Sequence, residues 1–189
     1  MTEKRYGMVI DLRRCFGCQT CTVGCYVWNS LPEEIIWTHV ESPGSKNVFQ
    51  PTGKFPNVNL SFLPLLCNHC EDPACVKNCP SKAMHKREDG IVLVDQDRCI
   101  GCGYCEWSCP YGAPVLDPVK KVMSKCTLCV DRVEAGSLPY CVADCPGKAR
   151  VFGDLNDPDS EVSKLVASRK GRPLCPENGT GPSIYYVGP

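Results

Sequence analysis

The sequence lacks long hydrophobic runs and any excess of charge. Its most apolar stretch, residues 58–66, is interrupted by Asn59, Ser61 and Pro64, and it is far shorter than the roughly 18 residues of a membrane-spanning helix. Basic and acidic residues number 21 each, so the basic surface typical of nucleic-acid-binding proteins is missing. We therefore expect no transmembrane segment in this chain and no nucleic-acid partner.

Targeting and catalytic motifs are missing as well. Residues 1–14 carry charges at Glu3, Lys4, Arg5 and Asp11 without an apolar core or a small-residue cleavage site, so no signal peptide is expected. The sequence contains no phosphate-binding glycine loop, no nucleophile with an orienting base and no open-site metal motif. We therefore expect that this protein is not an enzyme by itself.

Cysteine, by contrast, is abundant. The 189 residues include 17 cysteines, together with 16 glycines and 17 prolines. No ordinary hydrophobic core uses cysteine at this density. The fold is therefore expected to be held together by disulfides or by metal ligation.

Sixteen of the cysteines fall into four blocks of two kinds. The first and third blocks have gaps of two, two and three residues, whereas the second and fourth have gaps of two, four, three and of two, eleven, three. Flanking residues repeat too, because Asp11 and Gly17 align with Asp95 and Gly101, and this indicates duplicated units. The blocks are Cys15, Cys18, Cys21, Cys25; Cys67, Cys70, Cys75, Cys79; Cys99, Cys102, Cys105, Cys109; and Cys126, Cys129, Cys141, Cys145.

This spacing favours paired [4Fe–4S] clusters. Three closely spaced thiolates can enclose one cubane, and the fourth cysteine, expected to start a helix and to face away, ligates the other cluster of the pair. Proline follows Cys79, Cys109 and Cys145, as is typical of such runs, whereas Tyr26 follows Cys25. Zinc would leave the middle cysteine of each tight triad without a role, and cysteines two residues apart are poorly placed to form disulfides.

Two pairings of the blocks satisfy the spacing, one sequential and one nested. The linker 80–98 carries a turn at Glu88, Asp89 and Gly90 before the β-branched run 91–94, which predicts the hairpin expected between the halves of one ferredoxin unit. Nesting is therefore favoured. It predicts four ligand sets: Cys15, Cys18, Cys21 with Cys145; Cys126, Cys129, Cys141 with Cys25; Cys67, Cys70, Cys75 with Cys109; and Cys99, Cys102, Cys105 with Cys79.

Four such clusters would bring about −8 of charge, since each cubane with four thiolates carries about −2. We expect the basic residues that flank the fourth block to lie near clusters and to raise their potentials. These residues are Lys125, Arg132, Lys148 and Arg150.

Other parts of the sequence carry weaker signals. Cys175 is expected to be an inert, buried or half-buried thiol, and His69 to lie behind the ligands or to face solvent. Residues 26–66 bear aromatic side chains that either dock a partner or cover the clusters from water. Residues 160–170 are predicted to form a short amphipathic helix, followed by an extended tail through Val187.

The sequence resembles the four-cluster iron–sulfur subunits of the dimethyl sulfoxide reductase family. The similarity is densest over residues 67–114, in C-N-H-C-E-D-P-A-C and C-I-G-C-G-Y-C-E-W-S-C-P-Y-G-A-P. In nitrate reductase relatives a tryptophan replaces one cysteine of the third block, whereas Cys102 is intact here. The resemblance therefore implies four [4Fe–4S] clusters, and it implies the nested pairing as well.

The resemblance also implies a function in anaerobic respiration. Such subunits relay electrons to or from a large molybdopterin catalytic subunit and often contact a membrane anchor subunit. It implies a location peripheral to the cell membrane, on the outer (periplasmic) face after export with the partner, and a cytoplasmic location is the alternative. The alternative function is a stand-alone soluble polyferredoxin carrier.

The expected fold is a loop-rich α+β fold with two ferredoxin-like lobes, one inserted in the other. Residues 1–25 and 115–150 would form a discontinuous first lobe, and residues 67–114 the inserted lobe. Residues 26–66 would be a variable connecting loop, and residues 151–189 a C-terminal helix and tail.

Overall fold

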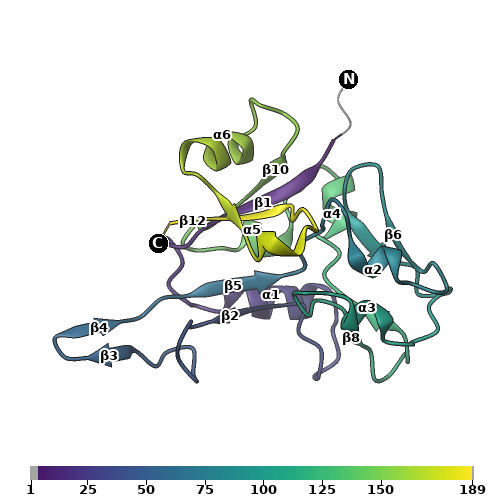
Figure 1. The fold of residues 1–189 in the computed structure, drawn as a ribbon, viewed down its shortest axis with the longest axis horizontal. Helices are drawn as coiled ribbons and strands as arrows, with labels where there is room; N and C mark the ends of the chain where they lie inside the picture. Colours follow the sequence, from purple (N-terminus) through teal and green to yellow (C-terminus); the bar gives the residue numbers. More distant parts are fainter. Residues whose placement is uncertain (1–3, 189) are drawn as a thin grey trace.

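The computed structural model describes residues 4–188, which form a mixed α/β fold rich in loops (Figure 1). The helices are α1 (Thr20–Trp28), α2 (Ala74–Lys77), α3 (Tyr104–Trp107), α4 (Val130–Glu134), α5 (Tyr140–Ala143) and α6 (Glu161–Ser168), followed by the 3-10 turn η1 (Pro176–Asn178). Within residues 4–188, no helix is long and apolar enough to cross a membrane.

The strands are short and form one four-stranded sheet and four two-stranded pairs. They are β1 (Tyr6–Asp11), β2 (Thr38–Glu41), β3 (Thr52–Lys54), β4 (Asn57–Asn59), β5 (Leu63–Leu66), β6 (Met84–Lys86), β7 (Val92–Val94), β8 (Val115–Leu116), β9 (Met123–Ser124), β10 (Arg150–Asp154), β11 (Arg172–Pro173) and β12 (Ile184–Val187).

The four-stranded sheet gathers segments from both ends of the described chain. Its order is β10-β1-β12-β11, with β1 antiparallel to β10 and parallel to β12. Met8, Val9 and Ile10 of β1 are fully buried, as expected for a central strand covered on both faces. The predicted extended tail is confirmed as β12, and the sheet explains why it is ordered.

The predicted C-terminal helix is confirmed as α6, which packs against this sheet. Ser160 caps its first turn by accepting a hydrogen bond from the Ser163 amide at 3.2 Å. Val162 faces the sheet and is fully buried.

The predicted hairpin in the middle of the chain is confirmed as the β6–β7 pair, in which Met84 lies opposite Val94. Gly90 turns the chain at a φ of 83°, which a residue with a side chain rarely adopts. The β8–β9 hairpin lies beside the third cysteine block, because the Met123 amide donates to Cys99 Sγ at 3.3 Å.

Residues 26–66 contain two further strand pairs. β2 pairs with β5 and leads into the β3–β4 hairpin, which projects from the body of the molecule (Figure 1). Among the aromatic side chains of residues 26–66, Phe55 is 92% exposed whereas Trp37 packs against the core, and their docking and covering functions stay predictions.

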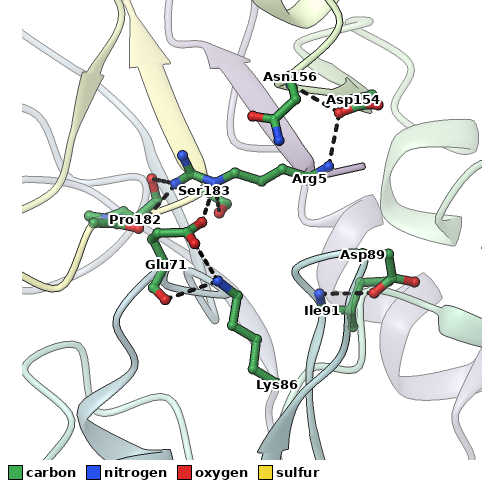
Figure 2. Close-up of polar contacts among 10 residues, drawn as sticks. Arg5, Glu71, Lys86, Asp89, Ile91, Asp154, Asn156, Pro182 and Ser183 are labelled. Carbon is green, nitrogen blue, oxygen red and sulfur yellow. Dashed lines mark hydrogen bonds and ion pairs between the residues drawn. The ribbon is translucent and has the colours of Figure 1, made fainter. Parts of the chain in front are cut away.

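Arg5 links the sheet to the 67–114 part of the chain. Figure 2 shows its guanidinium between Glu71 and Ser183, with Nε 2.9 Å from the carboxylate and 3.3 Å from the hydroxyl. Lys86 Nζ contacts the same carboxylate at 2.6 Å. Exposed ion pairs add at most about 1 kcal/mol each, so this contact defines orientation more than stability.

Candidate iron–sulfur sites

Each cysteine block places its third cysteine inside a helix. These residues are Cys21 in α1, Cys75 in α2, Cys105 in α3 and Cys141 in α5. The expectation that the fourth cysteine starts a helix is therefore wrong. A proline disfavours helical geometry at the residue before it. Where proline follows the fourth cysteine, the helix therefore ends before that cysteine. Tyr26 imposes no such limit, and α1 continues through Cys25 to Trp28.

The first site is a cavity lined by the four cysteines of one predicted ligand set, Cys15, Cys18, Cys21 and Cys145. Burial raises the pKa of Cys15, and the Cys21 and Cys145 thiols raise it further. The loop turns at Gly17, where φ is 72°. The ring of Phe62 packs directly against this glycine and covers the loop.

The second site is a cavity lined by Cys25, Cys126, Cys129 and Cys141, again one predicted ligand set. Burial raises the pKa of Cys25 to about 12, and the nearby Cys141 and Cys129 thiols add to the rise. Because no proline follows Cys25, α1 continues past this residue. The helix thereby places the Cys25 thiol beside the cysteines of the fourth block.

The third site brings Cys109 beside the second block. Burial raises the pKa of Cys75 to about 12 and that of Cys70 to about 11, and both thiols interact with Cys67 and Cys109. At the fourth site, burial raises the pKa of Cys105 to about 11, with contributions from Cys99 and Cys79. Cys102, in the same loop as Cys99 and Cys105, is exposed.

The first three sites are neighbours. Cys21 of the first site raises the pKa of Cys141 of the second, where burial is the main cause. Cys67 of the third site likewise raises the pKa of Cys126 of the second, which burial already holds far above its ordinary value. The thiols of neighbouring sites are therefore close enough to interact.

The donor set fits iron–sulfur clusters. Backbone amides donate to the thiol sulfurs, as from Leu128 to Cys126 at 3.4 Å and from Ala149 to Cys145 at 3.3 Å, and such bonds stabilise cluster thiolates. Within residues 4–188, no three His, Cys, Asp or Glu side chains converge closely enough to hold one metal ion. At the first and second sites, four thiols line one cavity each, an arrangement that suits a multi-iron cubane.

Two buried cations lie between the sites. Arg150 is 3% exposed and donates from Nη2 to Thr38 Oγ1 at 3.3 Å. Burial opposes its charge, but Cys141 and Cys21 raise its pKa above the ordinary value. Lys125 is 2% exposed, and its Nζ donates to the carbonyls of Cys126, at 3.0 Å, and Val92.

The other two expected cations are nearer the surface. Arg132 lies over the Trp28 ring at 4.8 Å from the centroid, and its charge lowers the pKa of Cys129, which burial raises. Lys148 is exposed to solvent. The expectation that Cys175 is buried or half-buried is wrong, because this thiol is exposed.

Two polar residues of the second block are deeply buried, since Asn68 and His69 are each 1% exposed. Asn68 was not expected from the sequence to be of interest, and His69 does not face solvent. Among the described residues, neither atom of the Asn68 amide nor Nε2 of His69 has a hydrogen-bond partner. The position of His69 between two cysteines was the available signal. Buried polar groups of this kind ordinarily have partners.

Comparison with known proteins shows what the chain is similar to. The profile of the 4Fe-4S dicluster domain matches residues 58–155. The B subunit of tetrathionate reductase from Salmonella typhimurium is 46% identical over 186 residues, which cover 97% of this chain and 72% of that protein. The B component of anaerobic dimethyl sulfoxide reductase from Escherichia coli is 43% identical over 181 residues, covering 95% and 87%. The arsenate respiratory reductase iron–sulfur subunit of Shewanella is 36% identical over 232 residues, covering 97% and 96%.

The fold, the thiol-lined sites and the profile define a protein of the [4Fe–4S] ferredoxin-type class. More particularly, it belongs to the iron–sulfur subunits of the dimethyl sulfoxide reductase family.

Proposed function

We propose that the protein is the electron-transfer subunit of a respiratory oxidoreductase and relays electrons through four [4Fe–4S] clusters. The observation that supports this proposal is that thiols from two blocks lie together at each of four places, which would form a series from the first site to the fourth. The proposed ligands are Cys15, Cys18, Cys21 and Cys145; Cys25, Cys126, Cys129 and Cys141; Cys67, Cys70, Cys75 and Cys109; and Cys79, Cys99, Cys102 and Cys105.

The nested pairing corresponds to two ferredoxin-like lobes, one inserted in the other. Residues 1–25 and 115–150 would hold the first two clusters, and residues 67–114 the other two. Residues 26–66 would connect them, and residues 151–189 would close the first lobe through β12. The contact between the Met123 amide and Cys99 supports placing the β8–β9 hairpin at the seam between the lobes.

The two ends of the series would be the points where electrons enter and leave. Cys18 in the first site and Cys102 in the fourth are exposed, whereas the thiols of the second site are all buried. Large apolar side chains are exposed near both ends, Phe16 at the first and Ile100 and Trp107 at the fourth. Exposed aromatic groups of this kind are typical anchors of protein interfaces.

We propose a large molybdopterin catalytic subunit as one partner and a membrane anchor subunit as the other. The complex would lie on the outer face of the membrane after export with the catalytic partner. Support comes from the relatives, which are named as subunits of tetrathionate, dimethyl sulfoxide and arsenate reductases. Native purification tests this proposal: co-elution with a much larger chain supports the relay, whereas elution alone favours a soluble polyferredoxin carrier.

The pairing has its own test. Cys79→Ser should alter the electron paramagnetic resonance (EPR) signal of the cluster that Cys102→Ser also alters. The matched variant Cys109→Ser should alter the signal that Cys70→Ser alters. If Cys79→Ser instead alters the cluster that Cys18→Ser alters, the pairing is sequential and the nested pairing is wrong. Iron and sulfide analysis of the wild-type protein should give about 16 atoms of each for four [4Fe–4S] clusters.

A further inference from the structure

His69 lies buried between Cys67 and Cys70 with a defined tautomer. The Val92 amide donates a hydrogen bond to Nδ1 at 3.1 Å, so Nδ1 contributes its lone pair and carries no proton. The ring proton must then be on Nε2. In the part of the chain that the structure describes, Nε2 has no hydrogen-bond partner.

Lys125 bonds to the same residue, Val92, that bonds to His69. Its Nζ donates to the carbonyl of Val92, the residue whose amide donates to His69, and to the carbonyl of Cys126. The peptide groups of Val92 therefore connect a buried ammonium to a buried imidazole.

His69 is connected to both the second and the third site: Cys67 and Cys70 flank it in sequence, and Val92, which bonds to its ring, also bonds to Lys125, whose Nζ donates to the Cys126 carbonyl. His69 follows Cys67, whose thiol interacts with Cys126, and Lys125, which interacts with His69, also interacts with Cys75. A buried donor without an acceptor costs about 1–3 kcal/mol. Sulfur atoms of an adjacent cluster are acceptors that would remove this cost.

We propose that His69 Nε2–H donates a hydrogen bond to a sulfur of the cluster held by the Cys67 set or of that held by the Cys126 set. This inference rests on the proposed function, because it requires clusters at those sites. His69 is then a positioning residue that adjusts one potential in the interior of the series. Reduction adds negative charge to the cluster sulfurs, so a donor stabilises the reduced state and raises the midpoint potential.

Redox titration of the purified complex, followed by EPR, tests the proposal. His69→Leu should lower one midpoint, that of the second or third cluster, and leave the other three unchanged. His69→Gln, which retains an N–H donor, should restore part of the shift. The control is His85→Leu, because His85 is exposed, and it should change none. Four unchanged midpoints in His69→Leu, or a shift confined to the first or fourth cluster, would overturn the proposal.

A measurement on the unaltered sequence covers the case in which His69→Leu fails to assemble. Protein labelled with ¹⁵N-histidine should show, by pulsed EPR of the reduced state, coupling of one histidine nitrogen to a cluster. A full iron complement without such coupling overturns the hydrogen bond alone. Protein that binds no iron overturns the proposed function itself, so the two failures are distinguishable.

Discussion

Arg150 carries a charge that the hydrophobic interior would not tolerate alone. It is buried beside Cys21 and Cys141, which belong to the first and second sites. Burying an unpaired ion costs several kcal/mol, so this guanidinium is stable there only with negative charge nearby. Two clusters of about −2 each would supply that charge.

Arg150→Met should lower the midpoints of the first and second clusters. A unit charge at roughly 8 Å with an effective dielectric constant of about 20 is worth about 2 kcal/mol, which is about 90 mV for a one-electron couple. The exposed Lys148 is the control, and Lys148→Met should shift the potentials far less because water screens its charge. Redox titration measures both, and equal shifts in the two variants would contradict this account.

Gly17 should be intolerant of a side chain. Its φ of 72° costs an alanine about 1–2 kcal/mol, and a Cβ there would lie 2.4 Å from an atom of the Phe62 ring. Gly112 has a φ of 59°, but among the described residues no atom comes within 4 Å of a Cβ at that position. Gly17→Ala should therefore lower the unfolding temperature more than Gly112→Ala and weaken the EPR signal of the first cluster.

At the scale of elements, the helices of the cysteine blocks are too short to be stable alone. α2, α3 and α5 each span four residues, and isolated helices shorter than about 12 residues are marginal in water. These short helices therefore depend on contacts with the rest of the folded chain. α6 differs, because it has a side-chain cap and an apolar face on the sheet.

Ser160→Ala should destabilise α6 by about 1 kcal/mol, since it removes the hydroxyl that accepts from the Ser163 amide. Ser168→Ala is the control. Ser168 is exposed, and among the contacts of the described chain its hydroxyl donates only to the Lys164 carbonyl of the same helix. We expect a change within about 0.5 kcal/mol there. Thermal unfolding of the iron-loaded protein measures both, and equal losses would show that the cap is not the cause.

At the scale of the whole molecule, the cysteines are part of the core. The largest buried cluster contains Cys21, Cys67, Cys126 and Cys141 together with aliphatic residues of the sheet. Metal ligation at these positions would join segments that are distant in sequence, so the free energy of cluster binding would contribute directly to folding.

Removal of iron should therefore unfold much of the molecule. Circular dichroism should show loss of structure in anaerobically prepared, iron-depleted protein, and limited proteolysis should cut it rapidly. Reconstitution with iron and sulfide should restore the resistance. A compact, protease-resistant form without iron would contradict the prediction.

The sequence by itself determined the features that depend on local spacing. The cysteine gaps predict the ligand loops, the turn at Gly90 predicts the β6–β7 hairpin, and the pattern of 160–170 predicts α6. Each depends on a few consecutive residues, so periodicity and turn chemistry suffice. The sequence also shows that no proline follows Cys25, but only the structure shows that α1 continues through Cys25 to Trp28.

Only the tertiary structure decided which distant segments meet. The parallel pairing of β1 with β12 and the contacts of His69 with Val92 and of Arg150 with Thr38 join residues far apart in the chain. Such contacts depend on the path of the whole backbone. Bringing distant segments together costs loop-closure entropy, which the other contacts of the fold must offset. The exposure of Cys175 was decided in the same way, because burial is a property of the packed molecule and not of the residue type.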